Sequence, residues 1–289
     1  MTDKVLSIGD AIRGFVPAGS LVFVGGFGQG VPFAAGREII RQGITGLTLC
    51  RTGADILFDL LVAAGAADRI VVGWFGNPGV GISHICRKAI REGRLALTET
   101  SNFGLLLQLE AAALGVPFLP AHVLSEGDLG ERADRKPVVC PFTGGTLSAV
   151  PALTPDVALV HALRADRHGN VQADGIMGDT LAGARAAKSV VVTVEEIVDD
   201  AVIRSEPERT ILPAHRVSAV VHAPFGAWPS YVKGLYDRDD EHYVAFDRLS
   251  RDPSKVHAYL AAIRAGGGLP DPERRAELMD RAGVPAHVL

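Results

Sequence analysis

The chain has 289 residues, of which 47% are hydrophobic and 21% are charged. This composition can bury a sizeable core, which excludes the disordered, collagen-like and disulfide-scaffold classes. The 33 acidic and 29 basic side chains leave a formal net charge of −4 and are spread along the whole chain. A nucleic-acid-binding protein needs a concentrated basic surface, so we expect no nucleic-acid partner.

The three cysteines Cys50, Cys86 and Cys140 are far apart and lack CxxC or Cys/His spacing. We therefore expect neither a disulfide framework nor a metal site. The amino terminus lacks a basic region followed by an apolar one, and no apolar run approaches the roughly 20 residues of a bilayer span. These features predict a cytoplasmic protein that is not attached to a membrane.

Short apolar runs alternate with segments of helical periodicity four times in the first half of the chain. The expected strands are 21–24, 47–50, 69–74 and 95–98, and the helices that follow them are 33–42, 56–64, 82–92 and 103–114. This order predicts an α/β fold with an open, mostly parallel sheet. Because the strands are apolar throughout, we expect helices on both faces.

This alternation of strands and helices stops at residues 121–150, which we interpret as loops and a flap. A second block is expected to continue the sheet, with strands at 156–161, 190–194 and 216–222 and a helix near 179–187. Residues 253–264 have the pattern of a closing helix. We predict one domain over residues 1–265 and a loosely held tail over residues 266–289.

A glycine-rich loop lies between the first strand and the first helix. Gly25, Gly26, Phe27, Gly28 and Gln29 could hold an anion there with backbone amides. The loop lacks the third glycine of a dinucleotide fingerprint and the GK[ST] of a P-loop. The alternative is a tight turn into a helix that begins at a proline.

Two further loops end the third and fourth strands at the same edge of the sheet. Gly76 and Asn77 follow the third strand, and Glu99, Ser101 and Asn102 follow the fourth. Ligands of open α/β sheets bind at this edge, so we expect the three loops to form one substrate site, with Glu99 as its catalytic carboxylate in partly dry surroundings. The alternative is that Glu99, Ser101 and Asn102 cap the next helix.

Other polar residues favour structural interpretations. No Ser/His/Asp or Cys/His arrangement marks a nucleophile, and His161 is expected to be a hydrogen-bonded core residue. Residues 166–170 have the composition of a turn. Arg87, Lys88, Arg91 and Arg94 are expected to form a solvated helix face that could also meet a phosphate group.

Several separated motifs resemble the α subunit of family I coenzyme A transferases. They are VGGF at 24–27 with Pro32, AAALGVPFLP at 111–120, VPAL at 150–153, DVAL at 156–159 and GNV at 169–171. Three more are similar to the glutaconate CoA-transferase branch: EIIRQGIT at 38–45, APFGA at 223–227 and GLYD at 234–237. The resemblance runs from about residue 7 to about residue 264.

This resemblance implies a fold of the family I (NagB/RpiA-like) type and a β subunit of similar architecture, expected as an α2β2 heterotetramer with its active site between subunits. It also implies ping-pong transfer of CoA from a short, dicarboxylic acyl-CoA to an acceptor acid, with no tightly bound cofactor. The nucleophilic glutamate is expected on the β subunit. Here Glu126 lies in a sequence, LSEG, that lacks the asparagine of the family's Ser-Glu-Asn-Gly motif.

The resemblance leaves two other functions open. Some proteins of this family act as hydrolases or lyases on CoA thioesters, and in some of them a carboxylate at the position of Glu99 takes the active role. Glutaconate transferases tend to have aspartate there. The alternatives are therefore a CoA-thioester hydrolase or decarboxylase that uses Glu99, or a non-catalytic subunit that binds acyl-CoA.

Overall fold

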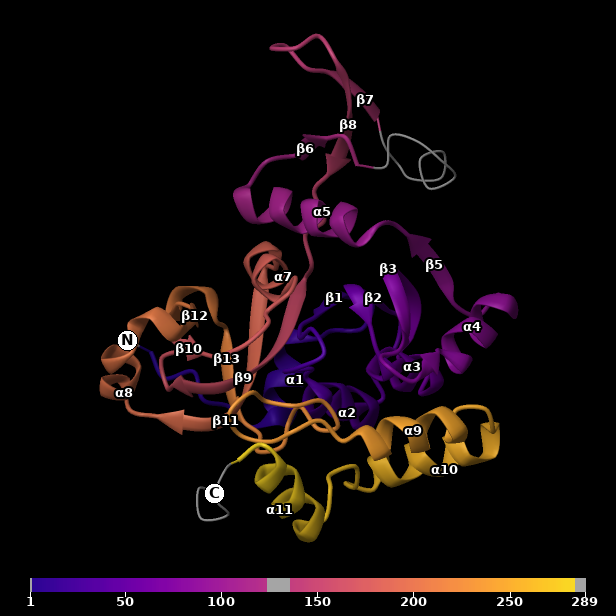
Figure 1. The fold of residues 1–289 in the computed structure, drawn as a ribbon, viewed down its shortest axis with the longest axis vertical. Helices are drawn as coiled ribbons and strands as arrows, with labels where there is room; N and C mark the ends of the chain where they lie inside the picture. Colours follow the sequence, from indigo (N-terminus) through magenta and orange to yellow (C-terminus); the bar gives the residue numbers. More distant parts are fainter. Residues whose placement is uncertain (1, 124–135, 284–289) are drawn as a thin grey trace.

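The computed structural model describes residues 2–123 and 136–283, and Figure 1 shows a sheet with helices on both sides. In space, the parallel strands run β13 (Ala219–His222), β11 (Ser189–Val198), β9 (Val157–Asp166), β1 (Leu21–Val24), β2 (Leu47–Ala54), β3 (Ala67–Asn77) and β5 (Ala96–Glu99). Three short strands extend the sheet in antiparallel pairs: β10 (Val171–Gln172), β12 (Thr210–Leu212) and β4 (Gly81–Ile82). The sheet is mixed and mostly parallel, which confirms the predicted α/β class.

Alternate residues of the central strands enter two separate cores. On β9, Val157 and Leu159 pack on one face, whereas Ala158 and Val160 pack on the other. The first core lies under α1 (Ile8–Phe15), α2 (Phe33–Gln42), α3 (Ile56–Ala63), α4 (His84–Arg91), α9 (Asp240–Leu249) and α10 (Pro253–Arg264). The second core lies under α5 (Asn102–Leu114) and α7 (Thr180–Ala186). Helices therefore cover both faces, as the apolar strands predicted.

The strand–helix units of the first half were predicted with small errors in their bounds. Helix α2 begins and ends as expected, because Gly43 follows it with φ +66° and closes its carboxyl end. Strands β2 and β3 continue by several residues past their predicted ends. In the second half, β9, α7, β11, β13 and α10 were expected, whereas β10, β12, α9 and α8 (Asp200–Ser205) were not.

The chain changes direction across the sheet between β1 and β9. From β1 it moves outward through β2 and β3 to β5, and it then returns to place β9 on the other side of β1. From β9 it moves outward again through β11 to β13. When the connections after two neighbouring strands run to opposite sides of the sheet, a crevice opens between the carboxyl ends of those strands. In this protein the crevice lies where the glycine-rich loop leaves β1.

The loops and flap expected at residues 121–150 contain a second, smaller sheet. Strands β6 (Phe118–Ala121), β8 (Thr146–Pro151) and β7 (Lys136–Val139) pair antiparallel and rise above α5 (Figure 1). Each contains a proline, and most of their side chains are exposed or half-buried. These strands were missed because they lack the apolar alternation that identifies a strand in a sequence.

The prediction of a loosely held tail after residue 265 is wrong for the residues that the structure describes. Helix α11 (Pro272–Arg281) packs Leu278 and Met279 into a third core beside Trp228 and Tyr236. Arg274 fixes this helix by donating from Nη2 to Asp239 Oδ1 at 2.6 Å and from Nε to Asp239 Oδ2 at 3.2 Å. The boundary of a separate domain at residue 265 stays a prediction.

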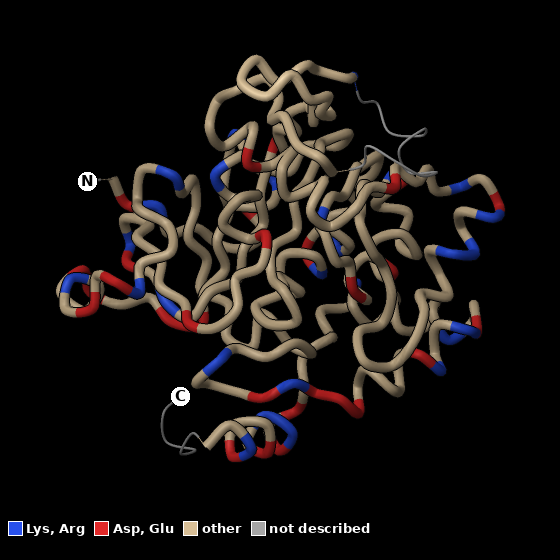
Figure 2. Tube along the Cα trace, turned by 45° about the horizontal axis from the view of Figure 1, so that its top comes forward, with Lys and Arg blue, Asp and Glu red and all other residues tan. Residues whose placement is uncertain are grey.

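Figure 2 shows that Lys and Arg residues alternate with Asp and Glu residues along the chain trace. Arg87, Lys88, Arg91 and Arg94 are exposed, as expected of a solvated face, and Glu92 forms ion pairs with Lys88 and Arg94. Among the described residues, no helix has the length and apolar character required to cross a membrane.

Candidate functional site

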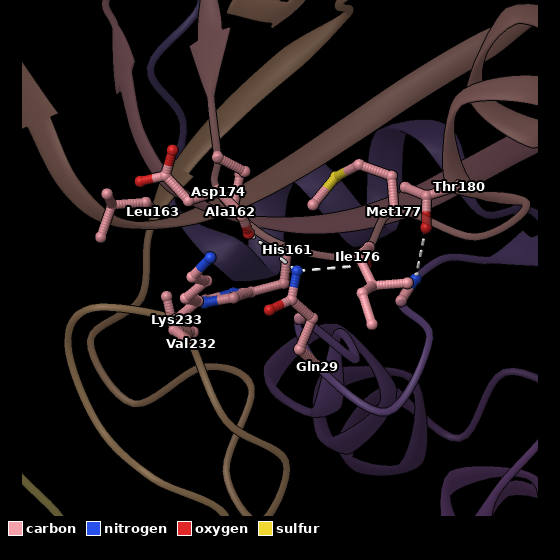
Figure 3. A pocket seen from close by; sticks show the side chains of 13 residues that line it. Gln29, His161, Ala162, Leu163, Asp174, Ile176, Met177, Thr180, Val232 and Lys233 are labelled. Carbon is pink, nitrogen blue, oxygen red and sulfur yellow. Dashed lines mark hydrogen bonds between the residues drawn. The ribbon is translucent and has the colours of Figure 1, made fainter. Parts of the chain in front are cut away.

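The glycine-rich loop lies at the crevice between β1 and β9. The pairing of Val24 with Leu159 puts Gly26 beside His161 along the sheet. The loop, β9, the segment 173–177, the start of α7 and residues 232–233 surround a small pocket (Figure 3). Its volume of about 20 Å³ is room for roughly one water molecule, so an acyl-CoA can bind only outside it.

Most of the loop amides predicted to bind an anion are already used within the chain. Gly25 N donates to Leu159 O at 2.8 Å, and Gly26 N donates to the Thr180 hydroxyl at 2.8 Å. Phe27 N donates to Gln29 O at 3.0 Å. The amides of Gly25, Gly26 and Phe27 are therefore not free to donate to an anion in this arrangement, and substrate binding by the loop stays a prediction. Gly28 is exposed, and its N–H makes no hydrogen bond to the described residues.

Two glycines of the loop are required for different reasons. Gly26 has φ +91°, and a Cβ there would lie 2.7 Å from Gln29 O and 2.8 Å from Gly30 O, both of them backbone atoms. Any side chain at this position would displace the loop. Gly28 has φ +77° but open space around a Cβ, so only its backbone conformation favours glycine.

Gln29 holds a neighbouring loop in place. Its side chain is 3% exposed, and Nε2 donates to Asp174 O at 2.8 Å and to Ile176 O at 3.1 Å. Its Oε1 has no hydrogen-bond partner among the described residues. Gln29 therefore does not offer its amide N–H groups to a substrate, and its role is to join the glycine loop to residues 174–176.

A buried polar cluster lies behind the loop. His161 is 5% exposed, with Nδ1 2.9 Å from the Thr193 hydroxyl and Nε2 2.7 Å from Glu195 Oε1. Glu195 also accepts hydrogen bonds from the Tyr236 hydroxyl at 2.6 Å and from Phe225 N at 2.6 Å. Burial first, and the Glu195 charge second, raise the pKa of Tyr236 well above its usual value.

This cluster confirms the interpretation of His161 as a hydrogen-bonded core residue. Glu195 was not predicted as part of the site, and Tyr236 appeared only within the GLYD motif at 234–237. A carboxylate inside the apolar run of β11 was the available signal for Glu195, because such a group is buried only with hydrogen-bond partners.

The structure holds Asn77 in a way that conflicts with its predicted role in binding substrate. Asn77 is 2% exposed, and its Nδ2 donates to Tyr243 O of α9 at 2.8 Å. Gly76 pairs with Ile82 in the short β3–β4 ladder. Both residues thus connect β3 to neighbouring elements, and Asn77 has no side-chain surface to offer a ligand.

Glu99 ends β5 at the carboxyl edge of the sheet. It is exposed and makes no hydrogen bond or ion pair with the described residues, so this chain alone does not supply the dry surroundings that we expected. The pairing of β5 with β3 aligns Glu99 with Val72. This row continues through Arg51 of β2 to the end of β1, which therefore lies three strand spacings, or about 14 Å, from Glu99.

The capping role predicted for this segment belongs to Ser101. Its hydroxyl accepts a hydrogen bond from Gly104 N at 2.9 Å and caps α5. Asn102 is the exposed first residue of that helix, and its side chain packs beside Gly73. Glu99 lies two residues before the cap and does not take part in it. Glu126 lies outside the described residues.

Four large apolar side chains are exposed around the same edge. Phe27 is 43% exposed, Trp74 46%, Phe103 56% and Ile176 59%. Phe27 approaches Gly53 at the end of β2, and Gly53 pairs with Trp74 of β3. Phe27, Gly53 and Trp74 thus place exposed apolar surface across the ends of β1, β2 and β3, and such surface marks binding sites.

Comparisons with known proteins agree with this arrangement. A family model for coenzyme A transferase matches residues 5–223. The chain is 41% identical over 261 residues to a 3-oxoadipate CoA-transferase subunit of Pseudomonas knackmussii, and the match covers 89% of this chain and 92% of that one. It is 34% identical to a glutaconate CoA-transferase subunit of Acidaminococcus fermentans, over 89% of this chain and 86% of that one.

Solved structures give the same result for the fold. The crystal structure of the Acidaminococcus fermentans glutaconate coenzyme A-transferase superposes with a TM-score of 0.87 at 32% identity, covering 95% of this chain and 92% of that chain. The decarboxylase AibA/AibB superposes with a TM-score of 0.79 at 31% identity, covering 90% of this chain and 100% of that chain. The match in sequence and in fold shows that the chain belongs to the coenzyme A transferase family.

Proposed function

We propose that this chain is the α subunit of an enzyme that moves CoA from a short, dicarboxylic acyl-CoA to an acceptor carboxylic acid. The observation that carries this proposal is the 41% identity to a 3-oxoadipate CoA-transferase subunit over nearly the whole of both chains. The names of two relatives, 3-oxoadipate and glutaconate CoA-transferase, both refer to dicarboxylates, which favours a dicarboxylic substrate.

The exposed apolar edge supports a heteromer. Phe27, Trp74, Phe103 and Ile176 would be covered if a β subunit docked over the carboxyl ends of the strands. Docking there would also remove Glu99 from water. The site in this proposal is shared, with the glycine loop and Glu99 on one side and the β subunit's catalytic glutamate on the other, and the assembly is an α2β2 tetramer.

The proposed reaction is a double displacement. First, a glutamate carboxylate on the β subunit attacks the thioester carbonyl. The carbon–sulfur bond breaks, CoA leaves as its thiolate, and the acyl group stays on the glutamate as an acyl-glutamyl anhydride. The thiolate then attacks the glutamyl carbonyl, which frees the first acid and leaves a glutamyl-CoA thioester. The acceptor acid repeats the two steps in reverse and leaves as its CoA thioester.

This chain's contribution would be orientation and stabilisation of charge. The Gly28 N–H can donate to an oxygen that gains negative charge as a tetrahedral centre forms, and Glu99 can orient the thioester by accepting a hydrogen bond from an amide N–H of its CoA. A second candidate function, hydrolysis or decarboxylation of a CoA thioester with Glu99 as general base, is favoured by the exposure of Glu99 and by the similarity to a decarboxylase. A non-catalytic subunit that binds acyl-CoA is the third.

The function is tested by purifying the chain alone and with its co-expressed β-type subunit, and by following CoA exchange between glutaryl-CoA and acetate by mass spectrometry. We expect acetyl-CoA to form only with the complex. Release of free CoA without acetyl-CoA would favour the hydrolase, and an intact thioester would favour the non-catalytic subunit. A monomer of this chain that turns over alone would contradict the shared site.

The role of the glycine loop is tested by Gly28→Ala in the complex. The added methyl group meets nothing in this chain, so Tm should fall only a little. It would instead crowd the thioester proposed to bind at this loop, so we expect a roughly 10- to 100-fold loss in kcat/KM. Gly65→Ala is the control, because Gly65 also has open space and φ +76° but follows α3 at the opposite edge. Equal kinetics for the two variants would show that the loop is only a turn.

Gly26→Ala should behave differently from Gly28→Ala. The left-handed backbone costs about 1–2 kcal/mol with alanine at either position. At Gly26 the Cβ also overlaps backbone atoms, so this variant should lose both stability and activity. Thermal unfolding of the two variants measures the difference. A Gly26→Ala protein with unchanged Tm would contradict the packing described for the loop.

The role of Glu99 is tested by Glu99→Gln in the complex, with Glu208→Gln as the matched control on an exposed 3-10 turn, η1 (Pro207–Arg209). If Glu99 orients a CoA amide in a transferase, KM should rise more than kcat falls, while Tm stays unchanged. A fall in kcat of roughly 10²- to 10⁴-fold would instead indicate a general base and favour the hydrolase or decarboxylase. Kinetics equal to those of the control would exclude both roles.

A further inference from the structure

A tight turn at residues 231–236 lies against the glycine loop. Gly30 N donates to Tyr231 O at 2.9 Å, which joins the two segments. The turn is closed by a hydrogen bond from Leu235 N to Val232 O at 3.0 Å, and Gly234 has φ +81°. This turn carries Lys233 to the wall of the pocket that Gln29 and His161 also line (Figure 3).

The base of the turn is rigid although its tip is exposed. Tyr236 is 1% exposed, donates its hydroxyl to Glu195 Oε1 at 2.6 Å, and stacks on Phe225 with ring centroids 4.5 Å apart. Val232 is 6% exposed. The backbone of Lys233 is therefore held in place before any ligand arrives, which lowers the entropy lost when its ammonium group binds one.

Lys233 has no counter-charge among the residues that the structure describes. It is exposed and forms no ion pair or hydrogen bond with the described residues. The other charged side chain in the pocket wall, Asp174, is already bound by Arg209, whose Nε donates to Asp174 Oδ1 at 3.1 Å. Within the described part of the chain, the pocket mouth therefore has an unbalanced positive charge close to the loop that offers the Gly28 amide.

We propose that Lys233 is the specificity-determining residue that binds the free carboxylate of a dicarboxylic acyl-CoA. This proposal rests on the proposed function and deepens it. The thioester end of the substrate lies toward Gly28 and the β subunit, and the far carboxylate lies at the turn. A monocarboxylic acyl-CoA of the same length has a methyl group in that place and gains nothing from the ammonium group.

The test compares glutaryl-CoA with pentanoyl-CoA, which have equal chain length and differ in the terminal carboxylate. In the complex, Lys233→Gln should lower kcat/KM for glutaryl-CoA about 10- to 100-fold through KM and leave pentanoyl-CoA within about 2-fold. Lys233→Arg keeps the charge and should restore most of the preference. Lys255→Gln, an exposed lysine on α10, is the control and should change neither substrate.

Thermal unfolding and calorimetric binding of glutaryl-CoA separate this proposal from the function on which it rests. Loss of glutaryl-CoA affinity in Lys233→Gln, with unchanged Tm, supports the carboxylate contact whether the thioester is transferred or hydrolysed. Equal losses for both substrates, or no loss for glutaryl-CoA, would overturn the role of Lys233 and leave the CoA-transferase function intact. A wild-type complex that binds neither thioester would overturn both.

Discussion

The carboxylate of Glu195 is the constraint on which the geometry of the crevice depends. It is 3% exposed and accepts hydrogen bonds from segments far apart in the sequence: His161 on β9, Phe225 after β13 and Tyr236 in the following turn. A buried carboxylate is costly unless donors satisfy it, so these segments cannot separate without a large loss of stability. The residue is structural in this role, since it lies behind the loop and not at the exposed edge.

Residues next to this cluster also form the hydrogen bonds that hold the glycine loop. The segment fixed by Glu195 supplies the Ser230 hydroxyl to Val31 N and the Tyr231 carbonyl to Gly30 N. From the other side, α7 supplies the Thr180 hydroxyl to Gly26 N. The loop is thus held by hydrogen bonds from both sides. A preorganised loop loses little entropy on binding, and its exposed Gly28 amide can act without rearrangement.

The fold could be predicted from the sequence because apolar runs and helical periodicity extended over whole elements. Helices α2 and α10 matched their expected bounds, and the edge of the sheet that carries Glu99 was identified correctly. Helix α11 was missed because it is mostly charged and buries only Leu278 and Met279. Its start signal, Asp271 followed by Pro272, was available but carries no information on packing.

The site was predicted less well than the fold, because spacing cannot show which polar groups already have partners. The glycine-rich loop predicted free amides, yet those of Gly25, Gly26 and Phe27 donate within the chain, and Asn77 is occupied by α9. Glu195 and Lys233 could not be identified as site residues from the sequence, because only the folded chain places them beside the loop. Whether a polar group has a hydrogen-bond partner depends on segments that are distant in the sequence. A motif therefore indicates the region of a site but not which of its groups are free.

The central claim is that the chemistry takes place on a partner subunit held against this chain. It is tested most directly by incubating the complex with glutaryl-CoA in the absence of an acceptor acid, quenching, digesting and mapping covalent adducts by mass spectrometry. The account predicts a CoA thioester on a glutamate of the partner and unmodified Glu99 and Glu126 on this chain. An adduct on either of these two residues, or turnover with no adduct on the partner, would contradict it.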